Sequence, residues 1–477
     1  MNLHSMIRTT KATQFLAVAA GLSLAAALVT GCSSGVSSST GTNINSPAVS
    51  VPVLITDAPS DQLVAFTLTL NSITLTDTAG KTASVLSSPT TIEICHLNGI
   101  QAPLVTASIP EDTYVSATIT FSSPQITYIT PAGLPVTVTP TLATTSFSLT
   151  FPAPITVSNT STSLLVDLLA GQSVAINGTT VTITPVFKVM AVPPPSTIPP
   201  PNQNGTGMQQ MGTVVSVSGT TLVIEPGSGP NFTLTTNSST VLQGFTALSA
   251  LTPGELVQVD FVLQPGGVYL ATRIQLAPPP PSGQPPINLL SGPVTSVSSG
   301  SFKMALMQGL GPAVSPVAAS AVSVFTITTN SSTTFAITPQ FVSLAGLPFT
   351  PSFTSANLTA GQAVGVVASS VSGTTATASN VYLIPQTIGG TVTAVSTSGS
   401  YTAYTLTLNS GSAFASLSGA STVTVYTSAA TAGPVVSTNN TPIKVGSQVR
   451  FNGLIFNTGS GTFSMVAGCS PDGPPGI

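Results

Sequence analysis

The acidic residues are the first candidates for chemistry, because 7 of the 11 Asp and Glu residues lie in the first part of the chain. These are Asp57, Asp61, Asp77, Glu93, Glu111, Asp112 and Asp167. Four of them, Asp57, Asp61, Glu111 and Asp112, fall in segments that we predict to be turns. Carboxylates that converge from turns could bind calcium or act as an acid/base pair on a glycosidic bond. The alternative, which the sequence favours, is that Asp57 and Asp61 bracket a Pro-containing turn and bind backbone amides two residues on.

A histidine and a cysteine stand next to each other at Cys95 and His96. In a strand over residues 91–97 their side chains would point to opposite faces, so they could not form a dyad or share a metal. We therefore expect a buried Cys95 and an exposed His96. Four Cys or His ligands for structural zinc cannot be collected within one domain. We predict no catalytic residue, no metal site, no cofactor and no enzymatic activity.

The N-terminus has the pattern of an export signal. Arg8 and Lys11 precede an apolar core over residues 15–29, and the core ends in Val29-Thr-Gly-Cys32. This ending resembles a lipobox, which implies cleavage after residue 31 and acylation of Cys32. Several acyl chains would tether the protein permanently to a membrane. In diderm lipoproteins, which this segment resembles, the absence of Asp after the acylated cysteine implies export to the outer membrane, and residue 33 here is Ser. The alternatives for the whole N-terminal segment are an ordinary signal peptide or a membrane-spanning anchor.

The composition is very poor in charge. Charged residues make up 4% of the chain, against about 25% in ordinary soluble domains. Loss of Arg8 and Lys11 would leave six basic residues against 11 acidic ones, a net charge of about −5. This disfavours nucleic-acid partners, since no basic patch would displace counterions from phosphates. The hydrophobic content of 42% with regular alternation indicates β-structure rather than disorder.

Apolar residues alternate with Ser and Thr throughout, which predicts an all-β chain. We expect a signal peptide at 1–31, a flexible stalk at 32–46 and a β-sandwich at 47–192. Pro-rich stretches at 193–207 and 277–289 predict semi-rigid linkers. Three small β-barrel or sandwich modules would then occupy 208–276, 290–385 and 386–470, followed by a tail at 471–477.

The three modules are predicted from an internal repeat. The segment Phe232–Thr240 (FTLTTNSST) recurs at Phe325–Thr333 with one change, from Leu to Ile. Each copy opens with Gly-x-Val-x-x-Val, and each later carries a turn glycine before a strand. The openings start at Gly212, Gly292 and Gly390, and the turn glycines are Gly254, Gly361 and Gly446. The second copy is longer, which predicts a hairpin insertion.

Two segments resemble uncharacterised bacterial families. The segments 53–61 (VLITDAPSD) and 109–114 (IPEDTY) are similar to motifs of domain-of-unknown-function family four-three-eight-two (DUF4382), over roughly residues 50–190. The hairpin departs from that family, which typically has Pro-Ala-Gly in place of Pro-Glu-Asp. The repeats resemble family five-six-six-six (DUF5666). Both resemblances imply an envelope lipoprotein, and neither implies a reaction or a catalytic residue.

These observations together predict a non-catalytic lipoprotein of the outer membrane with a structural or surface-contact role. The alternative is a glycan- or calcium-dependent binding protein at the cell surface. Tyr114 and Tyr128 are the best candidates for stacking on a sugar, or else are half-buried strand residues. The partners would be the membrane, through the lipid, and an envelope glycan or protein. Cys95 and Cys469 could form a disulfide or remain two separate thiols.

Overall fold

The computed structural model describes residues 46–57, 60–95, 102–158, 163–177, 180–192, 208–226, 231–264, 268–276, 287–314, 322–337, 344–428, 442–459 and 461–469. Among these described residues, strands account for 67% and helices for 4%, which confirms the all-β prediction. The expected signal peptide with Cys32, residue His96 and both Pro-rich linkers lie outside the described residues.

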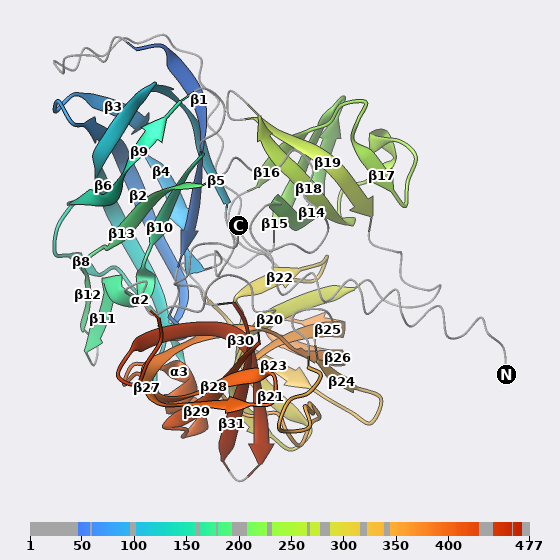
Figure 1. Ribbon diagram of the computed structural model, residues 1–477. Coiled ribbons are helices and arrows are strands. Elements are labelled where there is room, and N and C mark those ends of the chain that lie inside the picture. The colour runs from blue at the N-terminus through green and yellow to red at the C-terminus, as the bar shows by residue number, and fades with distance from the viewer. Residues whose placement is uncertain are drawn as a thin grey trace.

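The N-terminal domain is a β-sandwich (Figure 1). One sheet has the order β13-β10-β1-β5, with strands β1 (Ala48–Asp57), β5 (Ala102–Pro110), β10 (Ser163–Leu168) and β13 (Phe187–Val192). The larger sheet contains β2 (Leu63–Asp77), β3 (Thr82–Leu86), β4 (Thr90–Glu93), β6 (Asp112–Ile129), β7 (Pro135–Val138) and β9 (Ser146–Val157). A small third sheet is formed by β8 (Thr141–Leu142), β11 (Val174–Asn177) and β12 (Thr180–Ile183), next to the short helix α2 (Ala170–Ser173). A single hydrophobic core fills the space between the two main sheets.

Alternation of side chains explains why these strands form a sandwich. Along β2 and β6 the Phe, Leu and Ile side chains are buried, and Thr and Ser occupy the other face. The hydroxyls of that face bind one another across neighbouring strands, at 2.8 Å for Thr69–Thr91, 2.6 Å for Ser72–Thr120 and 3.0 Å for Thr118–Ser148. Hydroxyl pairs therefore stand where most proteins place charged side chains.

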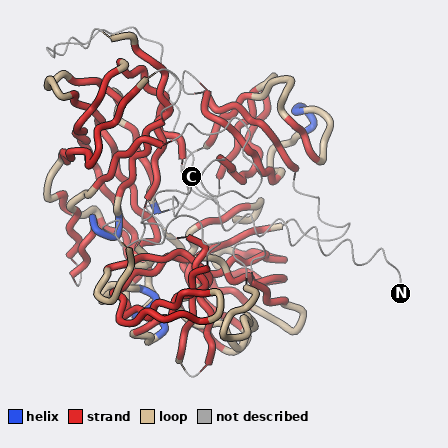
Figure 2. The backbone as a smooth tube through the Cα atoms, in the orientation of Figure 1, coloured by secondary structure: helices blue, strands red, loops and turns tan. Residues whose placement is uncertain are grey.

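Strands make up most of the three repeat modules (Figure 2), and the pairing of these strands follows one topology. In each of them the first strand pairs with the second and the fourth, the third runs parallel to the fifth, and the fifth pairs with the fourth. This closed order of 1-2-3-5-4-1 is that of the five-stranded Greek-key barrel called the OB-fold.

The five ring strands of each module follow one another along the chain. In module 1 they are β14 (Met208–Ser218), β15 (Thr221–Pro226), β16 (Phe232–Thr235), β18 (Leu256–Gln264) and β19 (Val268–Leu276). In module 2 they are β20 (Asn288–Ser298), β21 (Ser301–Ala305), β23 (Val324–Thr328), β25 (Ala363–Ser372) and β26 (Thr375–Leu383). In module 3 they are β27 (Gln386–Ser398), β28 (Tyr401–Leu408), β29 (Thr422–Ser428), β30 (Gln448–Gly459) and β31 (Thr462–Cys469). Short elements are added to this frame: β17 (Val241–Gln243), η2 (Leu248–Ala250), β22 (Gln308–Leu310), β24 (Thr334–Ile337) and α3 (Ala413–Ser418).

The nine-residue repeat closes the barrel between its third and fifth strands. In module 1, Thr235 Oγ1 donates to the carbonyl oxygen of Tyr269 at 3.1 Å, and Thr240 Oγ1 donates to that of Ala271 at 2.7 Å. Asn237 Oδ1 holds the intervening turn by accepting from the Ser239 amide at 2.9 Å. Module 2 repeats these bonds at Thr328–Ala376 (3.1 Å), Thr333–Ala378 (2.8 Å) and Asn330–Ser332 (2.9 Å). The repeated polar residues are therefore structural.

The glycine that opens each repeat lets two strands approach closely. A Cβ on Gly212 would lie 2.9 Å from the carbonyl oxygen of Glu225. A Cβ on Gly292 would collide with the carbonyl oxygen of Ala305, and one on Gly390 with that of Thr407. In all three modules a β-bulge follows two residues later.

Modules 2 and 3 share a hydrophobic core. Leu454, Phe456 and Val466 of module 3 are at most 2% exposed and pack into the core cluster of module 2. The predicted hairpin insertion is wrong for residues 344–362, which form loop and turns and no strand. This loop packs against module 3 instead, since the Phe349 ring lies 5.7 Å from the ring of Phe456. The insertion therefore joins two modules.

The other domains are also in contact. Met211 of module 1 is fully buried in a cluster with Leu289 and Tyr382 of module 2. Val64 and Ile129 of the N-terminal domain form a further cluster with Ala305 of module 2 and Ala413 of module 3. Each of the four domains therefore shares buried apolar surface with at least one other.

Candidate functional site

The four candidate acids do not form one site, because β1 places them at opposite ends of the N-terminal domain. Ala48 pairs with Pro110, so Glu111 and Asp112 lie beside the start of β1, whereas Asp57 ends that strand. Nine residues at about 3.3 Å each separate the two ends by about 30 Å. Within the described parts of the chain, no group of three or more His, Cys, Asp or Glu could hold a metal ion.

The Asp57 side chain is buried in the N-terminal sandwich, where it binds the start of α2. It is 2% exposed, and Oδ1 accepts a hydrogen bond of 3.1 Å from the amide of Ala170, at the start of α2. Burial, and then the charge of Asp57, raise the pKa of the Cys95 thiol well above its ordinary value. Cys95 is buried, as expected, and is a free thiol rather than half of a disulfide. A buried thiol with a raised pKa is poorly reactive.

Asp112 and Tyr114 stabilise the corner at which the chain passes from β5 in one sheet to β6 in the other; β5 and β6 do not pair, so the expected hairpin at residues 109–114 is wrong. Asp112 Oδ1 accepts from the amide of Thr113 at 2.7 Å, and the Tyr114 hydroxyl donates to the carbonyl oxygen of Pro110 at 2.8 Å. A tyrosine bonded to the backbone a few residues upstream is the tyrosine corner of Greek-key sandwiches. Burial, and then the charges of Asp112 and Asp77, raise the pKa of Tyr114 to about 12.

Neither candidate for sugar stacking presents its ring to solvent. Tyr114 is 0% exposed and Tyr128 is 3% exposed. Both are core residues, and the interpretation as strand residues is therefore correct; their burial is more complete than the half-buried state that we expected.

Asp61 joins the N-terminal domain to module 3. Its Oδ2 accepts hydrogen bonds from Ser412 Oγ at 2.6 Å and from the amide of Phe414 at 2.9 Å. Ser412 is the N-cap of α3, and its Oγ accepts in turn from the amide of Ala415 at 3.1 Å. Burial raises the pKa of the Asp61 carboxyl, and hydrogen bonds from Ser412, Phe414 and Ala413 oppose that rise. The two partners are 351 residues apart in sequence, so no local pattern could reveal this contact.

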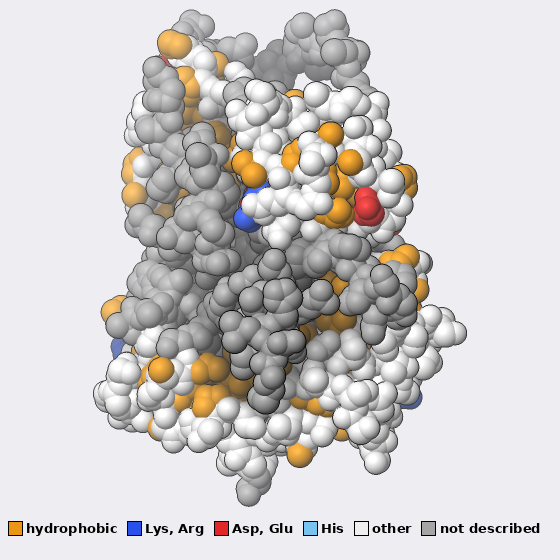
Figure 3. Space-filling view, turned by 90° about the vertical axis from the view of Figure 1, so that its right-hand side faces the viewer, with side chains coloured by type: hydrophobic (Ala, Val, Ile, Leu, Met, Phe, Trp, Pro, Cys, Tyr) orange, Lys and Arg blue, Asp and Glu red, His pale blue; other side chains and the backbone are white. Residues whose placement is uncertain are grey.

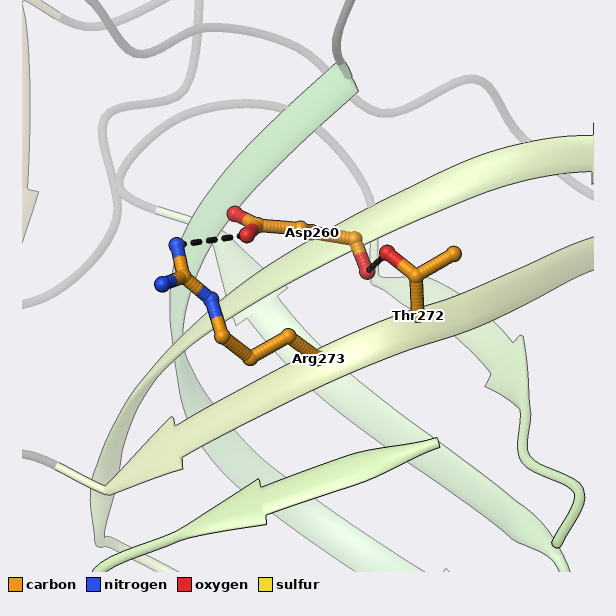
Figure 4. Close-up of polar contacts among 3 residues, drawn as sticks. All are labelled: Asp260, Thr272 and Arg273. Carbon is orange, nitrogen blue, oxygen red and sulfur yellow. Dashed lines mark hydrogen bonds and ion pairs between the residues drawn. The ribbon is translucent and has the colours of Figure 1, made fainter. Parts of the chain in front are cut away.

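An ion pair in module 1 was not predicted from the sequence. Asp260 Oδ2 lies 2.5 Å from the Arg273 guanidinium, on adjacent strands β18 and β19 (Figure 4). Beside the pair, Thr272 Oγ1 donates to the carbonyl oxygen of Asp260 at 3.1 Å, where the ladder has a bulge. Ser379 makes the equivalent bond to Val367 in module 2, at 3.0 Å. The Thr272 bond is therefore part of the fold, and the ion pair is an addition to module 1.

The surface is dominated by uncharged polar atoms. On the face shown in Figure 3, blue and red side chains occupy only small spots, whereas orange patches are scattered over both lobes. Exposed valines account for much of the large apolar surface, with Val241 at 52%, Val445 at 61% and Val395 at 42%. Over the residues that the structure describes, no helix combines the length and apolar character needed to cross a membrane.

Comparison with known proteins gives one family match, to module 1. Residues 211–275 match the family described as domain of unknown function (DUF5666), which supports the resemblance inferred from the repeats. No curated protein matches the chain. Among solved structures, a chain titled "drosophila Unr CSD456" is similar at 11% identity, over 54% of this chain and 95% of that chain, with a TM-score of 0.12. That TM-score is too low to support an argument, whereas the DUF5666 match shows that module 1 is similar to a family of unknown function.

Proposed function

We propose that this protein is a non-catalytic outer-membrane lipoprotein, anchored through Cys32, whose role is structural or one of surface contact. The main support is the way in which the domains interlock. The N-terminal domain, which would lie next to the anchor, is bound to module 3 by Asp61 and shares a buried cluster with modules 2 and 3. An anchored body of this kind presents a fixed surface rather than a set of separately moving domains.

The roles of the acids support the same proposal. Asp77 accepts from the amides of Ala79 and Lys81 at 2.8 and 2.7 Å, and Glu93 Oε1 accepts from the amide of Phe66 at 2.8 Å. These bonds, like those of Asp57 and Asp112, hold turns and strand ends in place. Each of these acids thus contributes to the fold, but Asp57 and Asp61 do so through groups far along the chain, whereas the sequence analysis expected amides two residues on.

The ligand-binding face of an OB-fold is formed by its second and third strands. In module 1 this face carries Thr221, Val223 and Glu225 from β15 with Thr233 and Thr235 from β16, all partly exposed. Bases are usually held there by aromatic stacking and cationic side chains. A face of Thr and Val with one acid, Glu225, and neither an aromatic nor a basic side chain among these residues suits contact with an uncharged surface better than contact with nucleic acid.

The second candidate is glycan binding, which the hydroxyl face of the N-terminal domain favours. Sugar hydroxyls could exchange hydrogen bonds with the paired hydroxyls of β2, β6 and β9, for example Thr118 and Ser148. Soluble envelope polysaccharide that protects this face from hydroxyl-radical footprinting would support this candidate over a purely structural role.

The anchor is tested by metabolic labelling with a palmitate analogue. The wild-type protein should be labelled and should fractionate with the outer membrane, and Cys32→Ala should remain an unlabelled, uncleaved precursor. The role is tested by complementation of a deletion strain, scored by detergent sensitivity of the envelope. We expect rescue by the wild type and by the control Asp112→Asn, and no rescue by Cys32→Ala. A labelled Cys32→Ala protein, or full rescue by it, would overturn the proposal.

A further inference from the structure

Each repeat module carries two elements that can dock on a neighbour. The first is the outward face of its second and third strands, and the second is the turn that precedes its fourth strand and carries the turn glycine. Some copies of these elements are buried inside the molecule and others are free. The free copies identify the surfaces that are left for a partner.

The strand face is covered in modules 2 and 3. In module 3 the Tyr401 hydroxyl donates to the carbonyl oxygen of Ala345, in the insertion of module 2, at 2.9 Å. The Phe349 ring of the same insertion lies 5.6 Å from the ring of Tyr426. In module 2, Ala305 is fully buried in the cluster shared with the N-terminal domain. In module 1 the outward residues of β15 and β16 are partly exposed, and none of them belongs to a cluster shared with another domain.

The turn is buried in module 2 and exposed in module 3. In module 2, Gln362 follows the turn glycine and is 0% exposed, and its Nε2 donates to the carbonyl oxygen of Ile455 in module 3 at 2.9 Å. In module 3, Lys444 is exposed, Val445 is 61% exposed and a Cβ on Gly446 would meet nothing within 4 Å. The turn of module 1 is open as well, so exposure alone does not select one of them.

Charge selects one face and one turn. Glu225 lies on the free face of module 1, and Lys444 lies in the free turn of module 3. Each stands where the other two modules have an uncharged residue: Ala305 and Thr407 for Glu225, and Thr252 and Thr359 for Lys444. Within the described parts of the chain, neither side chain makes a hydrogen bond or an ion pair. In a chain with 4% charged residues, two unpaired charges of opposite sign on docking elements indicate complementary surfaces.

We propose that the exposed turn of module 3 docks on the face of β15 and β16 in module 1 of a second copy of this chain, with Lys444 paired to Glu225. Val445 then covers Val223, which lies between Thr221 and Glu225 on the outward side of β15. The turn and the face are different surfaces, so copies join head to tail rather than as a two-fold dimer. A second copy supplies the turn because β15 and β16 lie in the upper lobe of the molecule, whereas β30, which follows the turn, lies in the lower lobe (Figure 1).

The contact is weak in solution. One turn on one sheet face is smaller than a stable interface, which buries about 1,200 Å² or more. Anchoring of many copies in one membrane, as in the proposed function, raises their effective concentration, but the contact itself does not require the lipid. Reversal of either charge replaces attraction by repulsion, which should raise the dissociation constant about five- to tenfold.

Sedimentation velocity of the chain from Ser33 to Ile477, which keeps every described residue and lacks the lipid, measures this self-association. The average mass of the wild type should rise with protein concentration, and less so at high salt, because an exposed ion pair is screened. Glu225→Lys and Lys444→Glu should each shift the rise to about five- to tenfold higher concentration. The double variant should recover the wild-type curve, since the two signs are exchanged. Lys303→Glu, which reverses another exposed lysine, is the matched control and should behave as the wild type.

Disulfide cross-linking identifies the two surfaces. In a background with Cys469→Ser, chains with Val223→Cys mixed with chains with Val445→Cys should form a mixed dimer on oxidation, at far higher yield than either variant alone. Cross-linking of either variant mainly with itself would contradict the head-to-tail arrangement. A wild type that stays monomeric at every concentration, single reversals without effect, or a double variant that does not recover would each overturn the proposal. None of these outcomes bears on the anchor at Cys32, which palmitate labelling tests separately.

Discussion

Gly361 of module 2 lies against Phe414 of module 3. A Cβ on Gly361 would be 3.1 Å from the Cα and from the carbonyl oxygen of Phe414, and 2.9 Å from its ring. Gly361 is also the turn glycine of its repeat, with φ of +92°. Its amide donates to the carbonyl oxygen of Val294 at 2.8 Å, as Gly254 donates to Val214 and Gly446 to Val392 at the same distance. One repeat position therefore has the same role in three turns but an added contact in one of them.

This relationship gives a prediction from matched substitutions. Gly254→Ala and Gly446→Ala should each destabilise their module by about 1 kcal/mol, because φ of +95° and +89° is unfavourable for alanine. At both positions the new Cβ would meet open space. Gly361→Ala should cost about 1–3 kcal/mol more, since the Cβ would press on the backbone of Phe414. Urea unfolding of the three variants checks this, and equal losses at all three positions would contradict the contact between modules 2 and 3.

Much of the fold could be predicted from the sequence because its causes are local. Alternation of apolar residues with Thr determines which face of β2 or β28 is buried, and the recurrent glycines mark turns and close approaches that repeat with the same geometry. The insertion in module 2 was the exception. Its length was visible, but Phe349 is placed by the surface of module 3 rather than by its neighbours in sequence.

The candidate acids were predicted less well, for a reason that lies in strand register. Asp57 and Asp112 belong to the same domain, but the pairing of β1 with β5 places them far apart. Asp57 ends β1, whereas Asp112 follows Pro110, which pairs with the first residue of β1. Asp77 and Asp112 bind amides within four residues, as acids in turns do, although the local interpretation was made for Asp57 and Asp61. Asp57 and Asp61 bind groups 113 and 353 residues away, and only the packed tertiary structure brings those groups together.

The repeated threonines give a second prediction. Thr240→Val and Thr333→Val should each destabilise their module by about 1 kcal/mol or slightly more, because a buried carbonyl oxygen on the fifth strand loses its donor. The affected oxygens are those of Ala271 and Ala378. Thr233→Val, on an outward position of β16, is the control and should be close to neutral. Differential scanning calorimetry of the mature protein measures the effect. A control as unstable as the two variants would show that loss of a hydroxyl at any position of this segment, rather than loss of the hydrogen bond to the fifth strand, causes the effect.

The third prediction concerns Tyr114 and pH. Its pKa in the folded protein is about 12, raised first by burial and then by the charges of Asp112 and Asp77. Because the folded pKa is higher than the unfolded value of about 10, the native state holds the phenolic proton more tightly. The stability contributed by the neutral phenol is complete below pH 10 and is lost as the pH rises from 10 towards 12.

Tyr114→Phe should therefore have two effects on the N-terminal domain. At pH 7 it should lower the free energy of unfolding by about 1 kcal/mol, since the bond to the Pro110 carbonyl oxygen is lost. Above pH 10 the difference from the wild type should shrink and can change sign, because phenylalanine has no proton to lose. Denaturant unfolding at pH 7, 9 and 11, followed by circular dichroism, measures both effects.

Tyr269→Phe is the matched control. Burial alone raises the pKa of Tyr269 to about 12 as well, but Tyr269 belongs to module 1 rather than to the N-terminal domain. A constant difference between Tyr114→Phe and wild type across this pH range would show that the Tyr114 hydroxyl has the same pKa in the folded and the unfolded protein. No difference at pH 7 would show that its bond to the Pro110 carbonyl oxygen contributes no stability.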